Sequence, residues 1–225
     1  MNSPTRTVLR FFKVMIRGQA YLNLLYLLAA FPLGVFYFVF VVTGLAAGIS
    51  LSILWVGIPL LLLAGAGWRA LAGFERWMAV HWLHEDVPAT AFPLREGGHT
   101  WTRFKDFLTH PVTWRSPLYL LMKFPLGIAT FVILITLTAL TLAFLSMPYT
   151  YTFLPDVQMG MFFRPGLAAW RIDSMSDAWL GVLVGLLLWP VTLHVTNGLA
   201  WLHAKLAKVM LGEVPWGPFT ALAEA

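Results

Sequence analysis

The sequence predicts an all-α integral membrane protein with four transmembrane helices, arranged as two tandem parallel-repeat helical hairpins with interfacial amphipathic helices. Apolar residues make up 59% of the 225 residues and charged residues 11%, against about 45–50% and about 25% in soluble proteins. Mean hydropathy is +0.76, and cysteine is absent. So few charges could not cover the surface of a soluble protein, which excludes a soluble enzyme or a nucleic-acid-binding domain.

Three long uncharged stretches account for the four helices. The first lies between Arg17 and Arg69 and has 51 residues; as one helix it would extend about 75 Å, against a hydrocarbon core of about 30 Å. It must therefore turn back, and Thr43–Ser50, rich in small residues, is the predicted turn. The expected helices run from about 22 to 45 and 51 to 68, followed by about 118–145 and 178–203 in the two later stretches.

The distribution of Lys and Arg predicts the orientation. Thirteen of the 15 lie in the N-terminal arm, the middle loop with the start of the third helix, and the C-terminal tail. Only Arg164 and Arg171 lie in the loop between the last two helices. Both termini and the middle loop are therefore expected in the cytoplasm. Because the net charge of +5 sits beside apolar runs, it indicates lipid rather than nucleic acid as a partner.

The sequence contains an internal repeat. The segment Tyr26–Gly34 reappears as Tyr119–Gly127 at an offset of 93, and Leu71-Ala72 reappears as Leu199-Ala200 at an offset of 128. The increase in offset locates an insertion in the second half. Each half would span the membrane twice and so enter from the same side, which makes an inverted-repeat transporter less expected.

We therefore expect one membrane domain over residues 1–225. Its repeat A covers about 10–88, its repeat B covers about 103–215, and an extracytoplasmic insertion covers about 148–178. In each repeat, an amphipathic extension is expected to follow the second helix, on the cytoplasmic side.

The paired Tyr-Leu-Leu-x-x-Phe-Pro-Leu-Gly segments, Val112-Thr113-Trp114-Arg115 and Leu199-Ala200-x-Leu202-His203 resemble a known family. It is the family of membrane sensor domains often found ahead of histidine kinases in Gram-positive bacteria and their relatives. The resemblance covers about residues 10–215 and implies a multi-pass protein of the bacterial cytoplasmic (inner) membrane with a sensing role. Ten residues follow Pro215, without a kinase module, so we expect the output to pass through a separate partner.

The N-terminal arm is a candidate lipid-surface segment. Its four cations, Arg6, Arg10, Lys13 and Arg17, follow each other at spacings of four, three and four, which places them on one helical face. Such a helix lies at the membrane interface with its cations near lipid phosphates. The alternative is docking of an acidic cytoplasmic partner.

Proline recurs inside the predicted spans, at Pro32, Pro59, Pro125 and Pro190. Each removes a backbone donor and usually kinks a helix, which neighbouring helices in a membrane tolerate. These helix-kink residues are expected either to set the packing between repeats or to act as hinges.

Histidines supply the candidate ligand residues. His194 lies within an apolar span near Thr192, Thr196 and Asn197; it could join a hydrogen-bond network, sense a proton or ligand, or hold a haem. His81 and His84 share a helical face, but no third ligand has helpful spacing, so they are weak metal candidates.

The segment of about 148–177 is rich in aromatic residues and is expected to form a short hairpin or an interfacial helix. It would be an aromatic belt at the membrane surface or the contact for a signal or partner. The candidate contact residues are Phe162, Phe163, Trp170, Arg171 and Asp173.

No catalytic or cofactor motif is present, and the acidic residues of the middle region, Glu75 among them, show no spacing that pairs them. We therefore expect a non-enzymatic membrane sensor-like protein that relays an envelope or membrane signal to a separate cytoplasmic kinase or regulator, without a cofactor. One alternative is a structural accessory subunit of a larger membrane protein complex. Another is an intramembrane haem, quinone or lipid binder.

Overall fold

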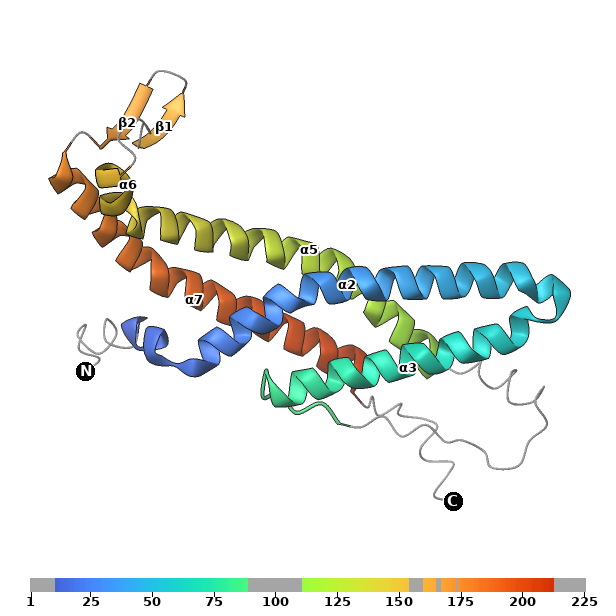
Figure 1. Cartoon of the computed structure of the whole chain (residues 1–225). Helices are drawn as coiled ribbons and strands as arrows, with labels where there is room; N and C mark the ends of the chain where they lie inside the picture. The colour runs from blue at the N-terminus through green and yellow to red at the C-terminus, as the bar shows by residue number, and fades with distance from the viewer. Residues whose placement is uncertain (1–10, 89–110, 154–159, 165–166, 173, 213–225) are drawn as a thin grey trace. The chain divides into compact units, whose positions relative to one another are not determined.

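A computed structural model describes residues 11–88, 111–153, 160–164, 167–172 and 174–212 of the chain. Within them, four helices are long and apolar enough to cross a membrane (Figure 1). They are α2 (Gly18–Leu51), α3 (Gly57–His81), α5 (Pro111–Leu145) and α7 (Met175–Leu211). The predicted class, an all-α integral membrane protein with four transmembrane helices, is confirmed.

The chain divides into two compact units, and three of the long helices contribute to both. Unit 1 consists of residues 1–24 and 132–198, which include the start of α2, the second part of α5 and most of α7. Unit 2 consists of residues 25–131 and 199–225, which include the rest of α2, all of α3, the first part of α5 and the end of α7.

The first hairpin turns later than the sequence predicts. Helix α2 continues through Thr43–Ser50 to Leu51, and the Thr43 hydroxyl donates to the Val39 carbonyl of the same helix at 2.6 Å instead of supporting a turn. The small residues there serve packing instead: a Cβ at Gly44 would lie 3.2 Å from that of Ala64 on α3. The reversal comes at the 3-10 turn η2 (Ser52–Leu54), after which Trp55 takes a left-handed backbone conformation with φ 62°.

The later helices are also longer than predicted. The expected amphipathic extensions are continuous with α3 and α7, which run unbroken to His81 and Leu211. An α-helix rises about 1.5 Å per residue, so the 37 residues of α7 exceed the length needed to cross the hydrocarbon core. A run without charges therefore underestimates these helices at their charged ends.

Pro32, Pro125 and Pro190 lie inside α2, α5 and α7, as expected. Pro59 does not lie mid-helix, because it falls in the first turn of α3, which begins at Gly57. A proline there removes no intrahelical hydrogen bond. The expectation of a kink at Pro59 is therefore wrong.

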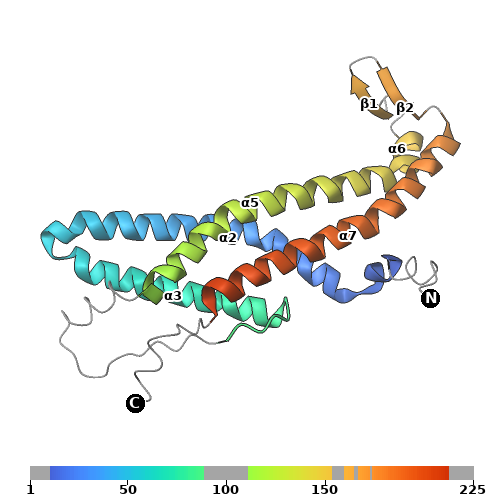
Figure 2. The same ribbon diagram turned by 180° about the vertical axis from the view of Figure 1, so that it is seen from behind.

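In unit 1, α5 and α7 lie side by side and lead to a short helix and a hairpin (Figure 2). The helix is α6 (Met147–Phe153), and the antiparallel strands are β1 (Gly160–Arg164) and β2 (Leu167–Arg171). The insertion thus contains a hairpin. The side chains of its candidate contact residues lie outside the described part of the structure: Phe162, Phe163, Trp170 and Arg171 on the strands, and Asp173 after them.

The N-terminal arm is not one continuous helix. The 3-10 turn η1 (Val14–Ile16) ends at Arg17, whose backbone is extended, before α2 begins at Gly18. The single helical face therefore does not reach Arg17, although Lys13 and Arg17 are both exposed. Arg6 and Arg10 lie outside the described residues.

In unit 2, α2 and α3 run antiparallel from the η2 turn (Figure 1). Their facing sides form a core with Tyr37, Val41, Ala64, Trp68 and Ala72. Helices α2 and α5 approach closely at two glycines. A Cβ at Gly34 would lie 3.0 Å from the Lys123 carbonyl oxygen, and a Cβ at Gly127 would lie 2.8 Å from the Ala30 carbonyl oxygen. Small residues permit such close contact between membrane helices.

Candidate functional site

Unit 2 contains an ion pair inside the membrane-spanning helices. The Lys123 ammonium of α5 donates to Oε2 of Glu75 on α3 at 2.6 Å, and both side chains are 0% exposed. Within the described residues, these are the charged side chains buried in the protein. Fully buried ionisable groups are costly unless they contact a partner of opposite charge.

Two tyrosines form hydrogen bonds with the ion pair. The Tyr119 hydroxyl donates to the same Glu75 oxygen at 3.0 Å, and the Lys123 ammonium donates to the Tyr26 hydroxyl at 2.5 Å. The ammonium also lies 4.7 Å from the centre of the Tyr26 ring. A ring face attracts a cation, so Tyr26 stabilises the charge through both its hydroxyl and its ring.

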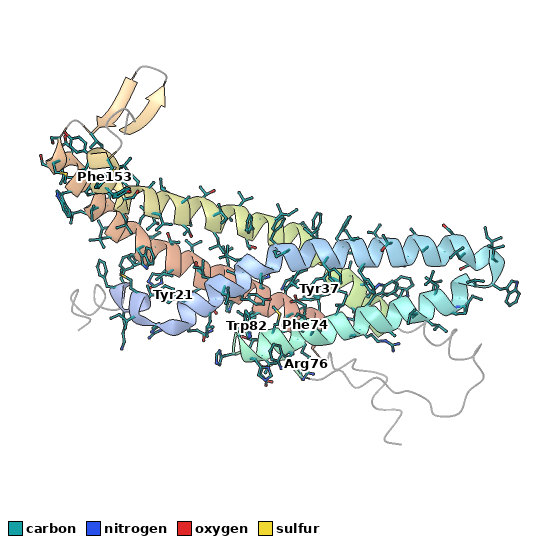
Figure 3. The ribbon with its side chains drawn as sticks, viewed as in Figure 1. Tyr21, Tyr37, Phe74, Arg76, Trp82 and Phe153 are labelled. Atoms are coloured by element: carbon teal, nitrogen blue, oxygen red, sulfur yellow. The ribbon has the colours of Figure 1, made fainter. Side chains whose placement is uncertain are left out.

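Further polar atoms around the ion pair have no hydrogen-bond partner within the described residues: Glu75 Oε1, the Tyr37 hydroxyl, and both ring nitrogens of His203. Figure 3 shows Tyr37 on the side of α2 that faces α3, and it interacts electrostatically with Glu75. The His203 ring of α7 packs edge-on against Tyr26, with ring centres 5.8 Å apart. We call Glu75, Lys123, Tyr26, Tyr119, Tyr37 and His203 the polar cluster.

Helical spacing explains how these residues meet. On α3, Glu75 shares its buried face with Trp68, Ala72 and Ala79, at separations of seven, three and four residues. On α5, Tyr119 and Lys123 are four residues apart, one turn of the same face. The small side chains beside Glu75 allow the α5 groups to reach the carboxylate.

The polar cluster can hold two opposite charges in an apolar surrounding, but only while α3 and α5 remain in contact. Attraction between unit charges grows as the dielectric constant falls, and so does the penalty for leaving one charge alone. The arrangement is therefore stable when complete and strongly unfavourable when one partner is displaced.

A second ionic contact joins the ends of α3 and α7 in unit 2. The Glu85 carboxylate accepts from Lys205 at 2.9 Å and from Lys208 at 3.1 Å. The segment between α3 and Pro88 is held back against the helices, because Arg76 donates to the Val87 carbonyl at 2.7 Å and the Val87 side chain is buried. Both lysines are more than one third exposed, so solvent screens this contact far more than the buried one.

This exposed contact predicts a small effect of pH. The hydrogen bonds from Lys205 and then Lys208 lower the pKa of the Glu85 carboxyl. A lowered folded-state pKa contributes stability above the unfolded pKa of about 4.3, and that stability is lost as the pH falls through the folded value. We expect Glu85→Gln to lower the free energy of unfolding by up to about 1 kcal/mol at pH 7. Below pH 4 the stabilities of the variant and the wild type should become more similar, because wild-type Glu85 is then protonated. Thermal unfolding against pH in detergent measures this; an equal difference at pH 7 and pH 3 would contradict it.

The histidines singled out from the sequence lie elsewhere. In unit 1, His194 is exposed, stacks on Phe11, and has Nε2 3.3 Å from the Phe11 carbonyl oxygen. The expected hydrogen-bond network forms without it, since Thr192 contacts Thr141 at 3.1 Å and Asn23 donates to Asn197 at 2.8 Å.

In unit 2, His81 and His84 are both exposed, and His81 contacts the Trp77 carbonyl oxygen at 2.9 Å. The expectation that they share a helical face is wrong, because α3 ends at His81 and His84 takes a left-handed conformation with φ 54°. Within the described part of the chain, no three histidine or acidic side chains gather in a way that could hold a metal ion.

The polar cluster is the site that sequence reasoning missed. The sequence predicts Lys123 just inside the third helix, as one of the cations of the cytoplasmic side, and Glu75 as an unpaired acid of the middle loop. The available signal was spacing: Glu75 lies among small residues at helical separations, and Lys123 follows a tyrosine by one turn. Length and hydropathy take a charge as the end of a span, so they do not detect charges that pair inside one.

Four apolar helices of membrane-spanning length define a multi-pass membrane protein, and the polar cluster is buried between its helices. The model of a family described as "Putative sensor" matches residues 26–211, a range that includes each residue of the polar cluster. The chain belongs to this family. No curated protein and no solved structure matches it.

Proposed function

We propose that the chain is a non-enzymatic sensor of the bacterial cytoplasmic membrane, which relays an envelope or membrane signal to a separate cytoplasmic kinase or regulator. Membership of the sensor family supports the sensing role. The observation that carries the mechanism is the fully buried contact between Glu75 and Lys123. In this proposal, the signal acts on the packing of α3 against α5.

A buried ion pair suits a sensor because it makes intermediate packings unfavourable. A displacement of about one turn along the helix would leave both charges without their partners in an apolar surrounding. The helices would then either keep the contact or exchange it for another complete arrangement. Coupling between distant sites needs such a two-state element, which both sites can bias.

The helices that carry the polar cluster also offer a route to the cytoplasm. Beyond Glu75, α3 leads within six residues to its end at His81, and beyond His203, α7 leads to Lys205 and Lys208. The Glu85 contact joins these two ends. A change in the packing of α3 would alter the charged surface offered to a partner.

The proposed orientation places both termini and the middle loop in the cytoplasm, with Lys13 and Arg17 near lipid phosphates. The chain contains no cysteine, so each introduced cysteine is a unique label. In intact cells, Phe153→Cys should react with a membrane-impermeant maleimide and Ala91→Cys should react only after lysis. The reverse pattern would contradict the orientation.

The signalling role is tested by the transcriptional response of the native host. Cells would be treated with benzyl alcohol to perturb the bilayer or with lysozyme to perturb the envelope. Deletion should abolish a defined response to one of them, and wild-type protein should restore it. The variant Glu75→Leu/Lys123→Met/Tyr119→Phe, matched for expression, should leave that response fixed in one state. Identical responses in the deletion strain and wild type to both treatments would overturn the proposal.

The alternative, a structural accessory subunit, predicts a different outcome from the same strains. Mild detergent purification should then recover the chain in fixed stoichiometry with the subunits of one membrane complex. Deletion should lower the amount of that complex. Recovery of the chain without such subunits, together with a lost transcriptional response, would favour the sensor.

A further inference from the structure

The close approach of α2 and α5 occurs twice, in equivalent positions. A Cβ at Gly34 would meet the Lys123 carbonyl oxygen and the Phe124 Cα, and one at Gly127 would meet the Ala30 carbonyl oxygen and the Phe31 Cα. These positions are related by the offset of 93 that separates the two copies of the Tyr-Leu-Leu-x-x-Phe-Pro-Leu-Gly segment. The second contact is therefore the first one with the two helices exchanged.

Two aromatic pairs show the same exchange. The rings of Phe31 and Phe131 stack with centres 4.7 Å apart and planes at 27°, and those of Phe38 and Phe124 with centres 4.6 Å apart and planes at 24°. An offset of 93 converts Phe31 into Phe124 and Phe38 into Phe131. Contacts in which residue i meets j while the equivalent of j meets the equivalent of i are the mark of a two-fold axis.

Four of the six residues of the polar cluster follow the same relation; the exceptions are Lys123 and Tyr37, whose equivalent at an offset of 93 is Thr130. Tyr26 and Tyr119 are equivalent at an offset of 93, and Glu75 and His203 are equivalent at an offset of 128, the one that relates Leu71-Ala72 to Leu199-Ala200. The equivalent of Lys123 is Ala30. One cation is therefore surrounded by two pairs of equivalent groups.

His203 lacks the contact that its equivalent makes. Its side chain is 1% exposed, and both ring nitrogens are without a hydrogen-bond partner in the described residues. Burial of an unpaired polar atom is unfavourable by the cost of removing it from water. Lys123 has three N–H donors, of which Glu75 and Tyr26 receive two, and the His203 ring lies against Tyr26.

We propose that a two-fold axis relates the two repeats within unit 2, and that His203 is the second acceptor for the Lys123 ammonium. Glu75 holds the ammonium in this structure. When the Glu75 carboxylate is lost or withdrawn, the lysine side chain turns so that an N–H of its ammonium donates to a His203 ring nitrogen instead of to Glu75. His203 acts as a positioning residue, and this role does not depend on whether the chain signals.

Exchange of the two equivalent residues tests the symmetry. Glu75→His alone should lower the unfolding temperature of the purified protein in detergent by about 10 °C, because Lys123 loses its counter-charge. The double variant Glu75→His/His203→Glu returns one carboxylate to the equivalent position and should recover at least half of that loss. A double variant that unfolds at or below the temperature of the single variant would overturn the two-fold relation.

A spectroscopic readout tests the second acceptor independently of stability. Among the six histidines, the ¹⁵N ring signals of His203 can be assigned by comparison with His203→Gln. In Glu75→Gln, one His203 ring nitrogen should shift to the position of a hydrogen-bonded acceptor. The shift should be absent in Glu75→Gln/Lys123→Met. Identical His203 signals in wild type and Glu75→Gln, or a shift that persists without Lys123, would overturn the proposal.

Discussion

Replacement of Glu75 with leucine should lower the free energy of unfolding by about 3–5 kcal/mol, the usual cost of breaking a buried ion pair from one side. The substitution leaves the Lys123 ammonium fully buried without a counter-charge and removes the acceptor of the Tyr119 hydroxyl. The packing of α3 itself changes little, because leucine and glutamate have similar volumes. Equilibrium unfolding of detergent-solubilised protein measures the effect.

Two variants separate the loss of charge pairing from a general effect of mutation. Glu85→Leu makes the same change at an exposed ion pair and should cost less than about 1 kcal/mol. Glu75→Leu/Lys123→Met/Tyr119→Phe removes the buried groups together and should regain most of the stability, since apolar replacements of complete buried pairs are often neutral. Equal losses of unfolding free energy in Glu75→Leu and the triple variant would show that Glu75 does not stabilise the protein through its ion pair with Lys123.

A leucine at Gly127 should separate α2 from α5 and destabilise unit 2 by at least about 1–3 kcal/mol, the usual cost of overpacking. Even a Cβ would lie 2.8 Å from the Ala30 carbonyl oxygen and 3.3 Å from the Phe31 Cα. These are backbone atoms, which cannot rotate away as a side chain can. The same separation should move Lys123 on α5 away from Tyr26 on α2, so the change should also weaken the polar cluster.

Gly73 provides the matched control, because a Cβ on this α3 glycine meets no atom within 4 Å. Gly73→Leu should be neutral or stabilising, since leucine is a better helix former than glycine by about 0.5–1 kcal/mol. Unfolding of the two variants under the same conditions makes the comparison. A loss in Gly127→Leu no larger than in Gly73→Leu would show that α2 and α5 are not in close contact at this glycine.

The sequence predicts the number and order of the long helices, because each apolar run must be long enough to cross the hydrocarbon core, but it underestimates their lengths. It misplaces the first turn because small residues occur both in turns and where two helices pack closely. Gly44 and Gly48 were interpreted as turn residues, whereas they admit the side chains of α3. The actual reversal depends on Gly57, where a Cβ would collide with the backbone of Gly48, Leu51 and Ser52.

The polar cluster could not be predicted from hydropathy because Glu75 and Lys123 each lie beyond the edge of an uncharged run. Their pairing depends on the packing of α3 against α5. The residue pattern of one helix does not show which other helix packs against it. On α3, the structure buries the small residues Ala72 and Ala79 beside Glu75 and leaves Phe74 exposed. Large side chains in a membrane helix can equally well face lipid.

The distribution of α2, α5 and α7 over both units limits how the protein can be divided. A gene fragment that ended at residue 24 or residue 131 would cut α2 or α5 within a continuous hydrogen-bonded helix. Neither unit is therefore a portable module for cloning. A split protein for co-expression should instead be cut between α3 and α5, which leaves every long helix whole and gives each fragment two of them.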